Sequence, residues 1–166
     1  NNDINSWMKS IARFISKPRR GAAGVPIPLT GLAQVGINGV SKVQAWLHPK
    51  DKPLPGGDPY FQKAPWQDMK LLPPPKDFGG GLPKDAIGPG VSPPVHGFDA
   101  KTGRPTSWPQ AYSLVHWAGL LPGVAAGRYE LRCRAINNRG VAQPLPRPFR
   151  KSGASDIERV SLTVRD

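Results

Sequence analysis

Few of the residue types that catalyse reactions occur in this 166-residue chain at a spacing that would let them act together. The three histidines are His48, His96 and His116, and the single cysteine is Cys133. They form none of the closely spaced His or Cys pairs that ligate zinc. Each histidine is therefore expected to be an ordinary polar group of a loop or strand, and we predict no metal site in this chain.

Cys133 and one pair of carboxylates are the remaining candidates for chemistry. Cys133 lies on the apolar side of an alternating stretch, where a thiol behaves as a small buried hydrophobe. Arg132 and Arg134 flank it in sequence but point to the opposite side of an extended chain, so they would not activate it as a nucleophile. Asp156 and Glu158 share a strand edge, and such a pair is more often solvated than an acid–base couple. The residues alone indicate no catalytic site.

The clearest structural element is the stretch of residues 127–144. Apolar and charged residues alternate along it, and the apolar ones are Tyr129, Leu131, Cys133 and Ala135. This period of two predicts a strand with one face on a core and one face in water. Residues 137–140 (Asn-Asn-Arg-Gly) predict the turn that follows. The Gly-x-Tyr entry is similar to the tyrosine corner of immunoglobulin-like sandwiches, in which the tyrosine bonds to upstream backbone.

Further strands are predicted over residues 24–35, 41–48, 111–117 and 157–164, with a short one over 66–72. The residues expected to face the core are Leu29, Gly31, Ala33, Val35, Val43, Ala45, Leu47, Val160, Leu162 and Val164. Trp46 falls on the otherwise polar face of its strand, where it either lies under a loop or sits in an interface. Six or seven strands with no convincing core helix predict an all-β fold, an immunoglobulin-like β-sandwich.

Residues 49–108 differ in kind, because they hold 13 of the 21 prolines and 9 of the 19 glycines. Such a composition cannot form the interior of a sheet. A loop this long is either functional or disordered, and its aromatic residues favour an ordered insertion. Trp66 and Trp108 within it, with Trp46 and Trp117 outside it, are the interface candidates, since aromatic rings are enriched where proteins meet.

Residues 1–20 leave two interpretations open. Apolar residues recur at a helical spacing, which favours a helix. Pro18 and the β-branched residues also fit an extended lead-in, which the resemblance described below favours. The chain begins at Asn1 without an initiator methionine, so we expect an excised or processed piece. In this interpretation residues 1–20 are a linker from an upstream catalytic domain, and residues 21–166 are the domain itself, with its insertion at 49–108.

The formal charge of +12 suits an anionic partner. The basic residues are spread over the chain without an RNA-recognition or zinc-finger signature, so we expect no nucleic-acid binding. No apolar run approaches the ~18 residues that span a bilayer, so we expect no membrane association. A stand-alone binding module with a basic face for an acidic partner is the alternative to the interpretation below.

A set of residues occurs in the order and spacing of a known domain. Its members are Tyr112, His116, Trp117, Gly127, Tyr129, Leu131, Arg134, Ala135, Gly140, Gln143, Pro144, Arg159, Val160, Leu162 and Val164, preceded by Ser10, Ile11, Pro18, residues 29–33, Val40, Lys42, Val43 and Ala45. The pattern covers residues 8–47 and 110–165. It resembles the C-terminal dimerisation domain of the sulfite oxidase family of molybdopterin-dependent oxidoreductases, with a longer central loop.

The resemblance implies an immunoglobulin-like sandwich of the E-set type that follows a separate catalytic domain. In that family the molybdopterin cofactor and its molybdenum-binding cysteine belong to the catalytic domain, so Cys133 is not that ligand and this chain binds no cofactor itself. The expected function is an accessory, dimerising one that is inactive in isolation. The implied partners are the upstream catalytic domain, a second copy related by a two-fold axis, and an electron acceptor such as a cytochrome. The bacterial members are periplasmic.

The resemblance also implies one contribution to the substrate pocket, from a late-loop arginine. Arg150 falls at about that position, and a guanidinium presents a planar fork to an oxyanion. The family has glycine after this arginine, whereas this chain has Lys151. From the residues alone, a solvated loop arginine is an equally good interpretation of Arg150.

Overall fold

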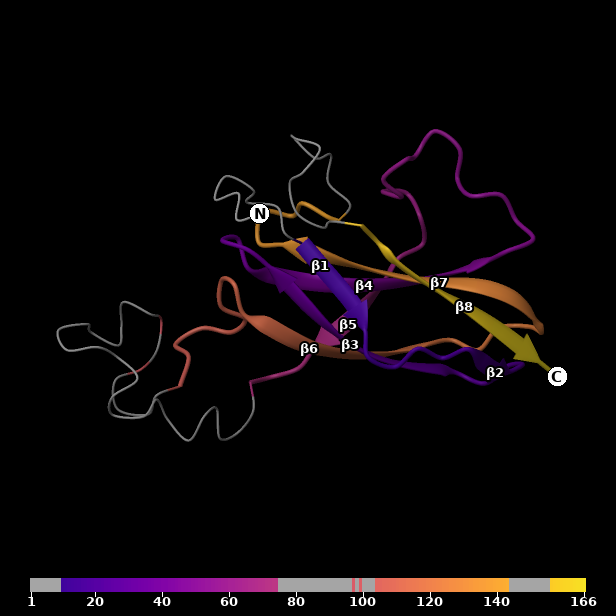
Figure 1. The fold of residues 1–166 in the computed structure, drawn as a ribbon, viewed down its shortest axis with the longest axis horizontal. Helices are drawn as coiled ribbons and strands as arrows, with labels where there is room; N and C mark the ends of the chain where they lie inside the picture. Colours follow the sequence, from indigo (N-terminus) through magenta and orange to yellow (C-terminus); the bar gives the residue numbers. More distant parts are fainter. Residues whose placement is uncertain (1–9, 75–96, 98, 100–103, 144–155) are drawn as a thin grey trace. The chain divides into compact units, whose positions relative to one another are not determined.

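In the computed structural model, the residues described are 10–74, 97, 99, 104–143 and 156–166. The chain forms two compact units, Asn1–Leu72 with Ala111–Asp166, and Pro73–Gln110. All eight strands lie in the first unit, which Figure 1 shows as a curled sheet. No helix in the described part of the chain is long and apolar enough to cross a membrane.

The eight strands form one sheet in the order β1-β3-β6-β5-β4-β7-β8-β2. Their bounds are β1 Ser10–Phe14, β2 Arg20–Ala22, β3 Ile27–Val35, β4 Val40–Pro49, β5 Gln67–Leu71, β6 Leu114–Leu121, β7 Gly127–Asn137 and β8 Glu158–Arg165. Neighbouring strands are antiparallel, except that β2 runs parallel to β8. The predicted all-β class is confirmed, with β2 as an additional strand.

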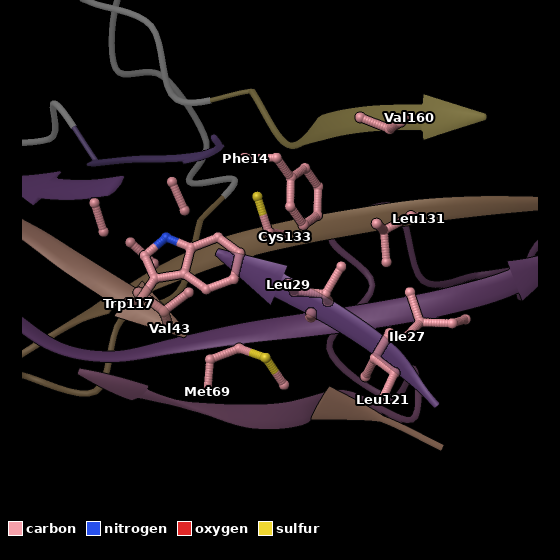
Figure 2. Packing of buried hydrophobic residues seen from close by; sticks show 14 of the residues in the cluster. Phe14, Ile27, Leu29, Val43, Met69, Trp117, Leu121, Leu131, Cys133 and Val160 are labelled. Carbon is pink, nitrogen blue, oxygen red and sulfur yellow. The ribbon is translucent and has the colours of Figure 1, made fainter. Parts of the chain in front are cut away.

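The sheet curls into a half-barrel around one core. The β1-β3-β6 half faces the half formed by β4, β7 and β8, because β1 contacts both β7 and β8 across the interior. β5, predicted as a short strand, joins the halves by pairing with β4 on one side and with β6 on the other. Figure 2 shows Trp117 and Leu29 of one half directed at Val43 and Leu131 of the other. Each large side chain buried in this way stabilises the fold by about 2 kcal/mol.

The predicted core faces of β3, β4, β7 and β8 are confirmed. Leu29, Ala33 and Val35 of β3 are buried, as are Val160 and Leu162 of β8. The prediction for β6 was wrong at its end. The strand was predicted to end at Trp117 but continues to Leu121, which packs into the core.

The N-terminal segment is extended where the structure describes it. β1 pairs with β3 from Ser10 to Phe14, and Ala12 and Phe14 are part of the core. The ring of Phe14 meets that of Trp117 edge to face at 5.5 Å between centroids. The second half of the expected linker 1–20 therefore belongs to the sheet, whereas residues 1–9 lie outside the described part.

The two halves of the sheet are also joined along the outer edge of β1 by three side chains, which we call the seam: Gln143, Asp156 and Glu158. Gln143 is fully buried, and its Oε1 accepts hydrogen bonds from the N–H groups of Ala12 and Ala135 at 3.2 and 3.1 Å. Its Nε2 donates to the carbonyl of Asp156. One amide thereby connects β1, β7 and the approach to β8, and satisfies backbone groups that would otherwise be buried without partners.

The predicted solvated pair of carboxylates lies at this same seam. Glu158 accepts a hydrogen bond from the N–H of Phe14 at 2.6 Å and pairs with Lys17 at 2.9 Å. Asp156 is exposed and pairs with Arg13 at 3.3 Å. The two acids thus tie β1 to the start of β8, and the expectation that both are merely solvated was wrong for Glu158.

Two local predictions about β7 are confirmed. The hydroxyl of Tyr129 donates to the carbonyl of Ala125 at 2.9 Å, the upstream bond expected of a tyrosine corner. In the turn after β7, Asn137 Oδ1 accepts from the N–H groups of Arg139 and Val141, at 2.9 Å each. Gly140 has a φ of 77°, which glycine adopts at little cost.

Gly31 is required at its position because Trp117 crosses directly above it. A Cβ on Gly31 would lie 2.2 Å from the Trp117 ring and 2.2 Å from the carbonyl oxygen of Arg13. Both neighbours are fixed, one in the core and one in the backbone of β1. The substitution Gly31→Ala is expected to lower the free energy of unfolding by about 3 kcal/mol, by overpacking.

The measurement is urea unfolding followed by tryptophan fluorescence. Gly56→Ala is the matched control, because a Cβ there has no atom within 4 Å and the variant should stay within about 0.5 kcal/mol of wild type. Equal stability of the two variants would contradict the packing of Trp117 on Gly31.

Candidate functional site

The outer face of β4 and β7 is the place where the structure departs most from the sequence pattern. The alternation predicts a charged face in water, yet Trp46, Arg132 and Arg134 are only 3%, 4% and 6% exposed. Trp46 lies opposite Arg132 in the β4–β7 register, and Gln44 lies opposite Arg134. The prediction of a wet face was wrong here, because the chain between β4 and β5 folds back over it.

We call this covering segment, residues 50–66, the strap. Its first part is tied to the sheet by the Lys50 N–H, which donates to Arg128 O at 2.8 Å, and by the His48 ring, whose Nε2 lies 3.0 Å from Lys52 O. Farther along, the Asp58 carboxylate accepts from the N–H groups of Gln62 and Lys63 at 2.8 Å each. The Asp58 turn thereby orients the residues that reach the arginines.

Phe61 connects the middle of the strap with both arginines of the sheet. Its carbonyl oxygen accepts from Trp66 Nε1 at 2.6 Å and from Arg134 Nη1 at 3.2 Å. Its ring lies 4.6 Å from the Arg132 guanidinium carbon. The φ of Phe61 is 52°, in the left-handed region that a bulky residue adopts only at a cost. These contacts offset that cost.

Arg134 is held on three sides. Its guanidinium lies 4.2 Å above the ring of Trp66, and its Nε donates to Gln44 Oε1 at 2.8 Å. Burial lowers its pKa to about 10, against the opposing charges of Asp58 and Asp68. It remains protonated at neutral pH, so the contact with Trp66 is a cation–π interaction, worth about 1–2 kcal/mol when partly desolvated.

Arg132 is paired with Glu130, two residues earlier on the same face of β7. Its guanidinium also lies over Trp46, at 5.6 Å from the ring centroid. Its Nε is buried with no hydrogen-bond partner among the described residues. Burial of a guanidinium with one unbonded donor costs free energy. The ion pair with Glu130 and the ring contacts offset this cost.

Trp46 is the centre of this arginine–aromatic cluster, which comprises Trp46, His48, Phe61, Trp66, Arg132 and Arg134. The rings of His48, Phe61 and Trp66 lie 5.0, 5.8 and 5.6 Å from that of Trp46. The cluster contains cations and π-surfaces but no nucleophile beside a base. Such a cluster can bind and position groups through its charges and ring faces.

The structure places the predicted interface residues in different settings. Trp46 and Trp66 come together in the arginine–aromatic cluster, the first buried and the second half-buried. Trp117 is fully buried in the core. Trp108, half-buried, belongs to the separate unit Pro73–Gln110. Arg150, the predicted pocket residue, lies outside the described residues, as does His96.

Cys133 has the surroundings of an inert thiol. It is fully buried in the core. Burial raises the pKa of the thiol well above its ordinary value, and the charge of Glu158 adds to the effect. In the described part of the chain, no group of three or more His, Cys, Asp or Glu side chains is placed to hold a metal ion.

Sequence reasoning missed Phe61, Asp58 and the seam residue Gln143 as positioning residues. Trp46 was the available signal, because a tryptophan on a polar face must be covered by something. Cross-strand register then brings Arg132 beside it. Nothing local indicates that Phe61 is the residue that returns to this pair.

No family model and no curated protein matches the chain. Among solved structures, one described as "AvmM Catalyzes Macrocyclization in Alchivemycin A Biosynthesis" is similar to it, with a TM-score of 0.43 and 11% sequence identity. The similarity covers 95% of this chain and 89% of that chain. A likeness at this level carries no argument about function.

The Asp58 turn predicts a pH dependence of the strap. The pKa of Asp58 is lowered from 3.8, first by the hydrogen bond from the Lys63 N–H and then by that from Gln62, with the charges of Lys63 and Arg134 adding to the effect. A depressed folded-state pKa means that the stabilisation is present above 3.8 and is lost as pH falls through the lower value.

We therefore expect the Asp58 carboxyl, followed by NMR, to titrate below 3.8, with the amide protons of Gln62 and Lys63 shifting at the same midpoint. In Asp58→Asn, these amide shifts should no longer respond to acid in this range. A midpoint at or above 3.8 would contradict the geometry of the turn.

Proposed function

We propose that this chain is the accessory, dimerising domain of a larger molybdopterin-dependent oxidoreductase of the sulfite oxidase type, without a catalytic centre of its own. The support is that the residues behind the resemblance serve as scaffold. Tyr129 holds the corner before β7, Gln143 closes the seam, and Trp117 packs on Gly31. Cofactor and substrate chemistry then belong to the upstream domain, with a cytochrome-type electron acceptor.

We also propose that the two halves of the curled sheet correspond to the two layers of an immunoglobulin-like sandwich of the E-set type. The support is that both halves share one core across which β1 meets β7, with β5 passing between them. The tyrosine corner at Tyr129 is a further feature in common with such sandwiches.

The surface that we assign to dimerisation is the outer face of β3 and β6. Leu114 and Leu120 share this face of β6 by their even spacing and are 53% and 62% exposed. The exposure of these leucines contrasts with the burial of Trp46, Arg132 and Arg134 on the β4–β7 face. A two-fold interface uses the same patch on both copies, and paired leucines would form its apolar centre.

The alternative, a stand-alone module with a basic face for an acidic partner, has less support. The two arginines at the centre of β7 are enclosed by the strap and are paired with Glu130, Gln44 and aromatic rings. They are therefore not displayed to a partner while the strap is in place.

Sedimentation equilibrium over a range of concentrations tests the proposed dimer. We expect the wild-type chain to self-associate, and the double variant Leu114→Glu/Leu120→Glu to sediment as a monomer, because four buried carboxylates would have no partners. Leu54→Glu, an exposed leucine of the strap, is the control and should still dimerise. A wild-type chain that is monomeric at every concentration would contradict the proposal, as would a double variant that dimerises equally well.

A further inference from the structure

The strap buries little of its own surface. Among residues 50–66 only Ala64 is buried, and residues 51–57 are all exposed. Gly56 and Gly57 lie in this exposed part, where a Cβ would meet nothing within 4 Å. A segment with so little buried apolar surface opens at a lower free energy than the core strands beneath it.

Between Lys52, which bonds to His48, and Trp66, which leads into β5, the strap's hydrogen bonds and ring contacts with the sheet are made by Phe61. Its carbonyl oxygen receives both Trp66 Nε1 and Arg134 Nη1, and its ring covers Arg132 and approaches Trp46. The left-handed backbone at Phe61 works against the closed position. Closure of this stretch therefore depends on the contacts of Phe61, against which the cost of its left-handed backbone works.

Opening of the strap would change the charge of the face beneath it. Arg132, Arg134 and His48 would meet solvent beside the already exposed Lys42. Asp58, whose charge acts on Arg134 in the closed state, would leave with the strap. The carboxylates that remain are Glu130, paired with Arg132, and Asp68, which is bonded to Lys42 and Gln44.

We propose that the strap is a lid that opens independently of the sheet, with Phe61 as its latch, and that opening uncovers a cationic, tryptophan-bearing face on β4 and β7. The charged face predicted for β7 would therefore reach water only in the open state of the strap. This inference goes beyond the proposed dimerisation and does not depend on it, because it concerns the opposite half of the sheet.

Amide hydrogen exchange of the full chain, read residue by residue, tests the lid. In wild type we expect the amides of Gln62 and Lys63, which bond to Asp58, to exchange faster than those of Cys133 and Ala135 in β7. In Phe61→Ala the strap amides should exchange about tenfold faster or more, the factor that 1.4 kcal/mol represents. The β7 amides should stay within about twofold of wild type, because the core is untouched.

Two further variants separate the latch from general damage. Tyr60→Ala removes the neighbouring exposed ring and should leave the strap amides unchanged. Phe61→Gly should open the strap less than Phe61→Ala does, because glycine adopts the left-handed conformation without the cost that alanine has there.

Iodide quenching of tryptophan fluorescence gives the second readout, since an anionic quencher is drawn to a cationic face. Quenching should rise in Phe61→Ala and not in Tyr60→Ala. The proposal is overturned if wild-type strap amides exchange only as slowly as those of β7. It is also overturned if Phe61→Ala accelerates both sets equally, or if Tyr60→Ala has the same effect.

Discussion

The sheet depends on how the outer edge of β1 is satisfied, because a curled sheet that stops short of closing leaves the backbone groups of its edge strands unpaired. Here Gln143 and Glu158 provide the missing acceptors, for the N–H groups of Ala12 and Phe14. These two side chains accept the hydrogen bonds that a further strand would accept at this edge. An unpaired edge invites association with another chain, and this seam removes part of that risk while holding the two halves over a common core.

The outer face of the half-barrel is covered over β4 and β7 but leaves leucines exposed on β6. The β4–β7 face is covered by the strap, which encloses two arginines against three aromatic rings. The β3–β6 face leaves Leu114 and Leu120 exposed. In the proposals above, the exposed leucines form the centre of the dimer interface, whereas the arginines and Trp46 meet solvent only when the strap opens.

Sequence patterns correctly predicted the features that depend on nearby residues. The core faces of β3, β7 and β8, the Tyr129 corner and the turn at Asn137 all follow from neighbours within a few residues. The strap and the seam did not follow, because Phe61 meets Arg134 and Gln143 meets Ala12 across long stretches of chain. The charged side of β7 was predicted to be wet for the same reason: alternation identifies which residues share a face, but not what covers that face.

The most direct test of the scaffold is the free energy of unfolding of Gln143→Ala, measured in urea. We expect a loss of about 2–4 kcal/mol, because removal of the amide leaves the buried N–H groups of Ala12 in β1 and Ala135 in β7 without acceptors. Gln34→Ala is the control, since that exposed amide also donates to a backbone carbonyl, of Tyr112 at 2.7 Å, and should cost less than about 0.5 kcal/mol. Equal, small losses in both variants would show that the seam does not hold the sheet together.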